Sequence, residues 1–325
     1  MGSDETAQAE VFLHQAEQAV GRSPRYADLC RRLAYDPAVA EILESPPRWD
    51  APLRLLGGLH YLVLTGRASW DHVEHALSAH REFLRGFVAE RRVQTNEVQR
   101  CWMLLPCFLE IAKRTRASVV DVIELGPSAG LNLIWDRYRY RYAAGAWGPK
   151  AAHLELSGEE RRPVPGSLLE PSMSVRSRIG IDLEPVDVTR DDGALLLKSF
   201  VWPDQTWRLR LLDEAITTFS EAPPRIVRGD VADVLPKLLA ERPSDALTLV
   251  WHTAVLGYLP EDRRQSVYDA LAAGGENGEL AFVETSKPED GSDNYWGLFA
   301  QVWPGGERVQ LAHADFHGAW LEWLA

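Results

Sequence analysis

The sequence has few cysteines and no long apolar run. Its three cysteines, Cys30, Cys101 and Cys107, have apolar neighbours and form no CxxC pair. They are therefore expected to be reduced, packed thiols rather than parts of a disulfide framework or a zinc site. No stretch approaches the roughly 20 apolar residues of a membrane helix. Residues 1–5 are polar and acidic, so no signal peptide is expected, and we predict a cytoplasmic protein.

The chain also lacks an excess of basic charge. It carries 35 Lys and Arg against 47 Asp and Glu, a net charge of −12. Nucleic-acid binding depends strongly on Lys and Arg contacts to phosphates. We therefore expect a small-molecule substrate and neither a nucleic-acid nor a membrane partner. With 325 residues, of which 46% are hydrophobic, the chain is long enough for two domains. The sequence does not indicate an oligomeric state.

Residues 1–118 have the pattern of helices. Ala, Leu, Glu, Gln and Arg are abundant, and apolar residues recur at three- and four-residue spacing, as at Leu53, Leu56 and Leu59. No strand-like alternation is present. Asn96 resembles an N-cap before an apolar stretch at 102–111, with Gln99 three positions later. We predict an all-helical N-terminal region of five or six helices that acts as a lid on the substrate side.

From residue 119 onward the pattern becomes that of an α/β protein. The segment 119–125 is short, β-branched and almost continuously apolar, which is typical of a buried parallel strand. Strands alternating with helices predict a doubly wound, mostly parallel sheet. Residues 298–312, with Gly305 and Gly306 at the turn, predict a final antiparallel hairpin, followed by a short amphipathic helix from about 317. Further strands are expected at 225–230, 246–251 and 279–284, with another that ends at 180–182, and helices at 192–219, 231–241 and 261–273.

Between the first two strands lies a predicted β-rich insertion, at about 137–178. Its segment 137–142 alternates Arg and Tyr, so Tyr138, Tyr140 and Tyr142 share one strand face. Residues 152–156 are a candidate partner strand. The tyrosines either pack on the core or form an aromatic wall for a substrate.

The first strand is followed by Gly126-Pro127-Ser128-Ala129-Gly130 and a predicted helix start. Ligands of open α/β sheets bind at the carboxyl ends of the strands, where such a turn lies. Three interpretations compete: an S-adenosylmethionine loop, a dinucleotide loop, and a nucleophile elbow with Ser128 exposed. Ser128 and Leu131 replace the second and third glycines of the dinucleotide pattern. A nucleophile elbow is normally preceded by several strands, whereas the preceding residues here have a helical pattern.

Acidic residues end the next two predicted strands. Asp182 follows Gly180-Ile181, and Asp230 follows Gly229. A carboxylate at the first position accepts both ribose hydroxyls of a nucleotide, and Asp230 could meet an adenine amino group. The alternative is that each aspartate caps the helix that follows it.

These segments resemble the motifs of class I S-adenosylmethionine-dependent methyltransferases, which have a Rossmann-like fold. Glu124–Gly130 resembles the first motif, 180–185 the second and 228–230 the third, and 248–260 resembles the fourth strand with its loop. The whole chain more closely resembles a bacterial family of unknown function with such a core. The segments that carry this likeness are 94–97, 128–133, 136–140, 180–183, 201–203, 303–307 and 317–324.

The resemblance implies a domain over 119–325 that binds S-adenosylmethionine and transfers its methyl group to a small-molecule acceptor. The catalytic candidates, each near a strand end, are His252 as a base, Tyr258 and Glu284. No metal is expected: in His313-x-Asp315-x-His317, Asp315 is predicted to cap a helix. The residues implied to bind the cofactor are Asn96, Glu124, Gly126, Pro127, Ser128, Gly130, Asn132, Asp182, Leu183, Asp230 and Val231.

Two other functions stay open on the sequence alone. A non-catalytic descendant would bind the same cofactor, or another nucleotide, to sense or regulate. A serine hydrolase would use Ser128 with His317 and either Asp245 or Asp315, although Asp and His are common enough to fit that order loosely.

Overall fold

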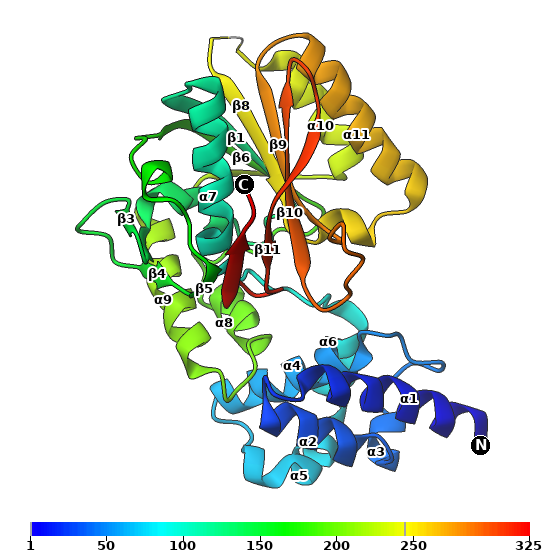
Figure 1. Cartoon of the computed structure of the whole chain (residues 1–325). Helices are drawn as coiled ribbons and strands as arrows, with labels where there is room; N and C mark the ends of the chain where they lie inside the picture. The colour runs from blue at the N-terminus through cyan, green and yellow to red at the C-terminus, as the bar shows by residue number, and fades with distance from the viewer. Residues whose placement is uncertain (1, 244) are drawn as a thin grey trace. The chain divides into compact units, whose positions relative to one another are not determined.

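The computed structural model describes residues 2–243 and 245–325 (Figure 1). The chain forms two compact units. The first consists of Met1–Thr95 and Asp187–Leu212, and the second of Asn96–Val186 and Asp213–Ala325. The first unit is thus built from two separate pieces of chain. No helix within the described ranges is long and apolar enough to cross a membrane.

The first unit is helical, as predicted for the N-terminal region. Its second piece packs on its first: His60 Nδ1 lies 3.2 Å from the Ser199 carbonyl oxygen. A side chain at Gly57 would be 2.8 Å from the ring of Phe200. The elements are α1 (Gly2–Ala19), α2 (Pro24–Leu33), α3 (Pro37–Ala40), α4 (Ala51–Leu64), η1 (Trp70–His72), α5 (Val73–Ala79), α6 (Arg81–Glu90), α8 (Asp191–Ser199) and the start of α9 (Thr206–Glu221). The helix predicted over 192–219 is therefore two helices, with Pro203 between them.

The second unit is built on a nine-stranded mixed sheet with the order β5-β12-β11-β10-β9-β8-β1-β6-β7. Its central strands are buried on both faces, which explains their continuous apolar sequences. The strands are β1 (Val119–Leu125), β5 (Glu159–Arg162), β6 (Ser174–Asp182), β7 (Arg225–Arg228), β8 (Leu247–His252), β9 (Leu280–Ser286), β10 (Trp296–Trp303), β11 (Arg308–Ala314) and β12 (Trp320–Trp323). All five predicted parallel strands are confirmed.

The parallel part of the sheet is doubly wound. Its spatial order, β7-β6-β1-β8-β9, is the 3-2-1-4-5 order of nucleotide-binding sheets, so the chain reverses direction between β1 and β8. The helices α10 (Val231–Glu241) and α11 (Glu261–Glu276) cover one face, and α7 (Arg100–Thr115) packs on the other (Figure 1). The predicted α/β class is confirmed, and ligands of such sheets bind at the point of reversal.

The prediction for the antiparallel end of the sheet is confirmed in part. β10 and β11 form the predicted hairpin. The amphipathic helix predicted from about 317 is wrong, because Trp320–Trp323 form strand β12 beside β11. Asp315 Oδ2 accepts the His317 N–H at 2.7 Å and so closes a turn rather than capping a helix.

The insertion holds a small sheet of β2 (Arg139–Tyr142), β3 (Gly145–Trp147) and β4 (Glu155–Ser157). The alternating tyrosines face the core. The hydroxyl of Tyr138 donates to the Leu131 carbonyl and that of Tyr140 to the Trp135 carbonyl, both at 2.7 Å. Both carbonyls belong to η2 (Leu131–Arg137), a short 3₁₀ segment that stands where a helix was predicted. The tyrosines thus hold the segment that follows the glycine loop.

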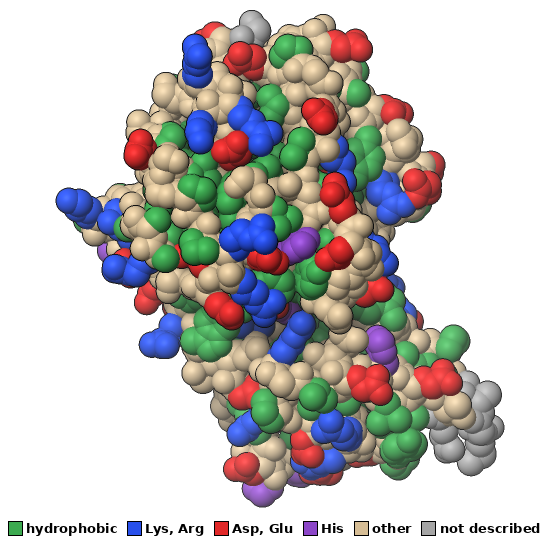
Figure 2. Space-filling view, viewed as in Figure 1, with side chains coloured by type: hydrophobic (Ala, Val, Ile, Leu, Met, Phe, Trp, Pro, Cys, Tyr) green, Lys and Arg blue, Asp and Glu red, His purple; other side chains and the backbone are tan. Residues whose placement is uncertain are grey.

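Charges of both signs are mixed over the surface. Figure 2 shows acidic and basic side chains interspersed on one face, with apolar side chains in small groups between them. This distribution is typical of an ordinary globular surface.

Candidate functional site

The carboxyl ends of β1, β6 and β7 are tied together by backbone groups. The Gly126 N–H donates to the Ile181 carbonyl at 2.8 Å, and the Gly229 N–H donates to the Asp182 carbonyl at 2.9 Å. The Ser128 N–H donates to Asp182 Oδ2 at 2.8 Å. The glycine loop and the first strand-end aspartate are therefore parts of one structure, as their order in the sequence predicted.

The loop needs its glycines because it is left-handed and tightly covered. Gly126 has φ +69° and Gly130 has φ +83°. A side chain at Gly126 would be 2.6 Å from Val255, so the close neighbour of this glycine is a protein side chain. Pro127 packs against Gly180, where a Cβ would be only 2.7 Å from its ring. Ser128 also has a positive φ, 56°, a conformation that costs a non-glycine residue free energy.

Glu124, near the end of β1, is a buried carboxyl group with 2% exposure. Burial raises its pKa to about 8, and the charge of Asp182 adds to the rise. The side chains of Trp251 and Asn132 and the charge of Arg100 oppose that rise. Within residues 2–243 and 245–325, Glu124 Oε2 has no hydrogen-bond partner. A buried acceptor without a partner is costly and marks a place where a cation or donor would be stabilised.

Two asparagines support the segment after the loop. Asn96 Oδ1 accepts the Leu131 N–H at 2.9 Å, so this side chain caps η2. The prediction that Asn96 caps the helix after it is wrong, because α7 starts at Arg100 with Gln99 as its cap residue. Asn132 is buried, and its Oδ1 lies 3.3 Å from the Cys101 sulfur.

The two strand-end aspartates differ in what they bind. Asp182 Oδ1 accepts the Glu184 N–H at 2.9 Å, and the next residue, Leu183, has 50% of its surface exposed. Asp230 caps α10 through the Ala232 N–H at 2.9 Å and forms an ion pair with Arg263, also at 2.9 Å. The residue after Asp230, Val231, is the first residue of α10 and packs in the core. Asp230 therefore has the capping role considered as its alternative, in addition to its place at the strand ends.

Two of the three predicted catalytic residues meet across neighbouring strands. His252 Nε2 lies 3.6 Å from Glu284 Oε2, and both side chains are almost fully buried. Neither ring nitrogen of His252 has a hydrogen-bond partner among the described residues. Tyr258 lies on η4 (Val255–Tyr258) with 70% of its surface exposed. The structure thus brings His252 and Glu284 together.

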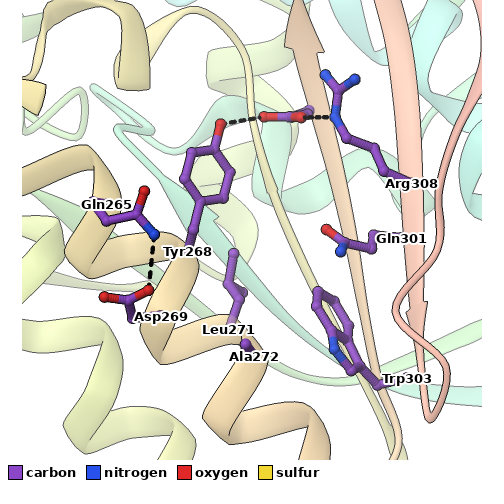
Figure 3. Close-up of a pocket in the computed structure, with 9 residues that line it drawn as sticks. Gln265, Tyr268, Asp269, Leu271, Ala272, Gln301, Trp303 and Arg308 are labelled. Carbon is purple, nitrogen blue, oxygen red and sulfur yellow. Dashed lines mark hydrogen bonds and ion pairs between the residues drawn. The ribbon is translucent and has the colours of Figure 1, made fainter.

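Glu284 also borders a cavity of about 470 Å³ between α11 and strands β9–β11 (Figure 3). Its carboxylate accepts the Tyr268 hydroxyl at 2.8 Å and Arg308 Nε at 2.6 Å. Burial acts to raise its pKa, but His252 and Arg308 outweigh burial and lower the pKa to about 2. Glu284 is therefore an ionised, firmly held carboxylate. The cavity is lined by Gln265, Tyr268, Asp269, Leu271, Ala272, Glu284, Gln301, Trp303 and Arg308.

One charged residue at the strand ends was not predicted. Arg100, the first residue of α7, donates from Nε to the Phe316 carbonyl at 3.0 Å and from Nη1 to Thr253 Oγ1 at 3.2 Å. Its guanidinium lies 4.9 Å from the ring centre of Trp296. Each contact comes from a segment more than 150 residues away, and Arg100 belongs to no recognisable motif. The sequence therefore carried no signal for it.

The geometry does not support a hydrolase arrangement that uses Asp245. Asp245 precedes β8 and forms an ion pair with Arg176 at 2.9 Å, whereas Ser128 follows the end of the parallel strand β1. The two residues thus lie at opposite ends of these parallel strands. The His313 side chain contacts Glu322 at 3.2 Å. In the part of the chain that the structure describes, no group of three or more His, Cys, Asp or Glu side chains could hold a metal ion.

The sequence profile of one protein family matches residues 9–323. The chain belongs to this family, described as uncharacterized protein conserved in bacteria (DUF2332). No curated protein matches the chain. Among solved structures, it is similar to an S-adenosylmethionine-dependent methyltransferase from Clostridium acetobutylicum ATCC 824, with 12% identity and a TM-score of 0.26, over 73% of this chain and 78% of that one.

Proposed function

We propose that this protein is an S-adenosylmethionine-dependent methyltransferase acting on a small-molecule acceptor. The observation that carries the proposal is that hydrogen bonds join the strand ends at the point where the strand order of the sheet reverses. There the left-handed loop at Ser128, the carboxylate of Asp182 and the buried carboxyl of Glu124 adjoin the ends of three parallel strands. This is where doubly wound sheets bind nucleotides.

The chemistry of these residues fits the cofactor. S-adenosylmethionine carries a sulfonium and an ammonium group, and Glu124 Oε2 is a buried acceptor without a partner in the described structure. The Asp182 carboxylate accepts the Ser128 and Glu184 N–H groups and is thereby held at the strand end, where an acidic side chain binds the ribose in nucleotide sites. The exposed Leu183 offers an apolar surface beside it for a base. In the proposal, Gly126, Pro127, Gly130 and Asn132 shape the loop, and Asn96 fixes its end.

The bound cofactor supplies the methyl group on a good leaving group, so the protein's own residues chiefly orient the acceptor and exclude water. A base is needed only for an acceptor that must lose a proton. His252 is the candidate for that role, and the ionised Glu284 beside it would stabilise a protonated imidazole. The exposed Tyr258 is proposed to contact the acceptor. The helical region at 1–118 is proposed to act as the lid.

Titration calorimetry with S-adenosylmethionine and S-adenosylhomocysteine tests the proposal. We expect both to bind the full chain, and Asp182→Asn to weaken both by about tenfold or more, since it alters the ribose-binding carboxylate. Asp187→Asn, in an exposed turn of the other unit, is the matched control and should leave binding unchanged. Absence of heat with both ligands would contradict the proposal. Binding without turnover on any acceptor would favour a non-catalytic module.

A fluorophosphonate probe separates the hydrolase alternative. We expect no labelling of Ser128. Of the two candidate acids, Asp245 lies at the opposite ends of the parallel strands, and Asp315 Oδ2 accepts the backbone N–H of His317 at 2.7 Å. Labelling that disappears in Ser128→Ala would favour the hydrolase over the methyltransferase.

A further inference from the structure

Arg100 occupies the point where the sheet reverses. Its Nη1 contacts Thr253, which directly follows β8, the strand that pairs with β1 at the reversal. Its Nε binds the Phe316 carbonyl in the turn after β11, and its plane faces Trp296. These anchors fix the position of a long, flexible side chain before any ligand arrives. Such preorganisation favours recognition of an anion by a guanidinium.

Arg100 and the carboxyl group of Glu124 lie at neighbouring positions of this edge, and the charge of Arg100 acts on that carboxyl. Thr253 lies two residues beyond Trp251, the register partner of Glu124 on β8. The residue after Arg100, Cys101, contacts Asn132, one of the side chains that act on the Glu124 carboxyl. Glu124 is 2% exposed, and its Oε2 lacks a partner among the described residues. A buried acidic acceptor beside an anchored cation is complementary to a ligand that carries both charges.

We propose that Arg100 binds the carboxylate of an α-amino acid group on the ligand and that Glu124 receives its ammonium. The inference rests on the proposed function, in which that group is the methionine part of S-adenosylmethionine. Arg100 would thus determine specificity for ligands with a complete amino acid end, whereas the strand-end residue Asp182 would bind the nucleoside end.

A purely structural role for Arg100 makes a different prediction. Its contacts with Thr253 and Phe316 tie the turn after β11 to the end of β8. If this were its whole role, a substitution of Arg100 would weaken the binding of every ligand by a similar factor. Ligands with and without the amino acid group therefore separate the two roles.

The test compares S-adenosylhomocysteine with 5′-methylthioadenosine, which shares the nucleoside and thioether but has no amino acid group. Binding to the full chain is measured by calorimetry for the native protein, Arg100→Met, Arg100→Lys and Arg114→Met. Arg114 lies on the same helix in an exposed ion pair with Glu110 and is the matched control. 5′-Methylthioadenosine also reports whether each variant keeps its nucleoside site.

We expect Arg100→Met to weaken S-adenosylhomocysteine binding about 10- to 100-fold, as for the loss of a charge-assisted pair, and 5′-methylthioadenosine binding less than about threefold. The affinity of Arg100→Lys for S-adenosylhomocysteine should lie between those of the native protein and Arg100→Met, because lysine retains the charge but lacks the paired N–H donors of the guanidinium. Equal weakening of both ligands, or native affinity for S-adenosylhomocysteine in Arg100→Met, overturns the inference but leaves the proposed function standing. If the native protein binds neither ligand, both fail.

Discussion

The backbone N–H of Ser128 donates to Oδ2 of Asp182 across 54 positions of sequence, at 2.8 Å. This bond joins the turn after the first strand of the sheet to the end of the second. It also holds a serine with a φ of 56°, in a conformation that glycine would adopt more readily. The long insertion between the two strands therefore does not separate the loop from its aspartate.

Replacement of Asp182 by Asn should destabilise the protein. The two carboxylate oxygens accept the Ser128 and Glu184 N–H groups, and an amide has only one oxygen to offer. We expect a loss of about 1–3 kcal/mol in the free energy of unfolding, measured with urea. Asp187→Asn is the control: its Oδ1 accepts the Thr189 N–H in an exposed turn, so a change within about 0.5 kcal/mol is expected. Equal effects would show that the bond to Ser128 contributes little.

Gly126→Ala should disrupt the loop. The new methyl group would meet Val255 at 2.6 Å on a backbone with φ +69°. Overpacking and the left-handed conformation together predict a loss of about 2–4 kcal/mol in unfolding free energy. Gly21→Ala has φ +75° and nothing within 4 Å, so it should lose only about 1 kcal/mol. Adding Val255→Ala to Gly126→Ala should recover part of the lost unfolding free energy. If stability is not recovered, the contact with Val255 is not the cause of the loss.

The buried carboxyl of Glu124 should make stability fall as the pH rises. Its pKa increases from 4.5 to about 8 on folding, so the folded state binds more protons than the unfolded state between these values. Its contribution is therefore fully present below about pH 4.5 and lost as the pH approaches 8. Urea unfolding at several pH values should show a flatter profile for Glu124→Gln across this range. The exposed Glu279→Gln is the control, and an unchanged slope in Glu124→Gln would contradict the assignment.

Tyr138→Phe should destabilise the segment that follows the loop. The hydroxyl is fully buried and donates to the Leu131 carbonyl at 2.7 Å, so its removal takes a buried hydrogen bond away from η2. We expect a loss of about 1–3 kcal/mol by thermal or urea unfolding. Tyr35, with 71% exposure, provides the control, because Tyr35→Phe should change stability by less than about 0.5 kcal/mol. A similar effect at both positions would mean that the hydroxyl bond is not what matters.

The sequence predicted those parts of the fold that depend on local pattern. The strands β1, β8 and β9 are buried along almost their whole length, and such strands have continuous apolar sequences. The segment from about 317 was predicted as a helix because it is short and amphipathic. It is a strand because the edge of β11 offers unpaired backbone groups to it. Tertiary pairing overrode a short periodicity there.

The site was predictable only where its residues follow strands. Asp182 and the glycine loop meet because parallel strands end at one edge, a property that sequence order alone conveys. Arg100 was missed because its anchors, Thr253 and Phe316, are distant in sequence and one of them is a backbone carbonyl, which has no sequence signature. The contact between His252 and Glu284 depends on the register between β8 and β9, which neither strand reveals by itself.

The two-piece composition of the helical unit has a consequence for synthesis on the ribosome. The first piece ends at Thr95 and the second begins at Asp187, so the 91 residues 96–186 emerge between them. At bacterial translation rates that interval is on the order of 5–20 s. During it the helix α4 lacks the partners that later bury His60 and Gly57, namely Ser199 and Phe200. The nascent chain thus holds an unfinished apolar helix bundle while the first strands of the sheet are being made.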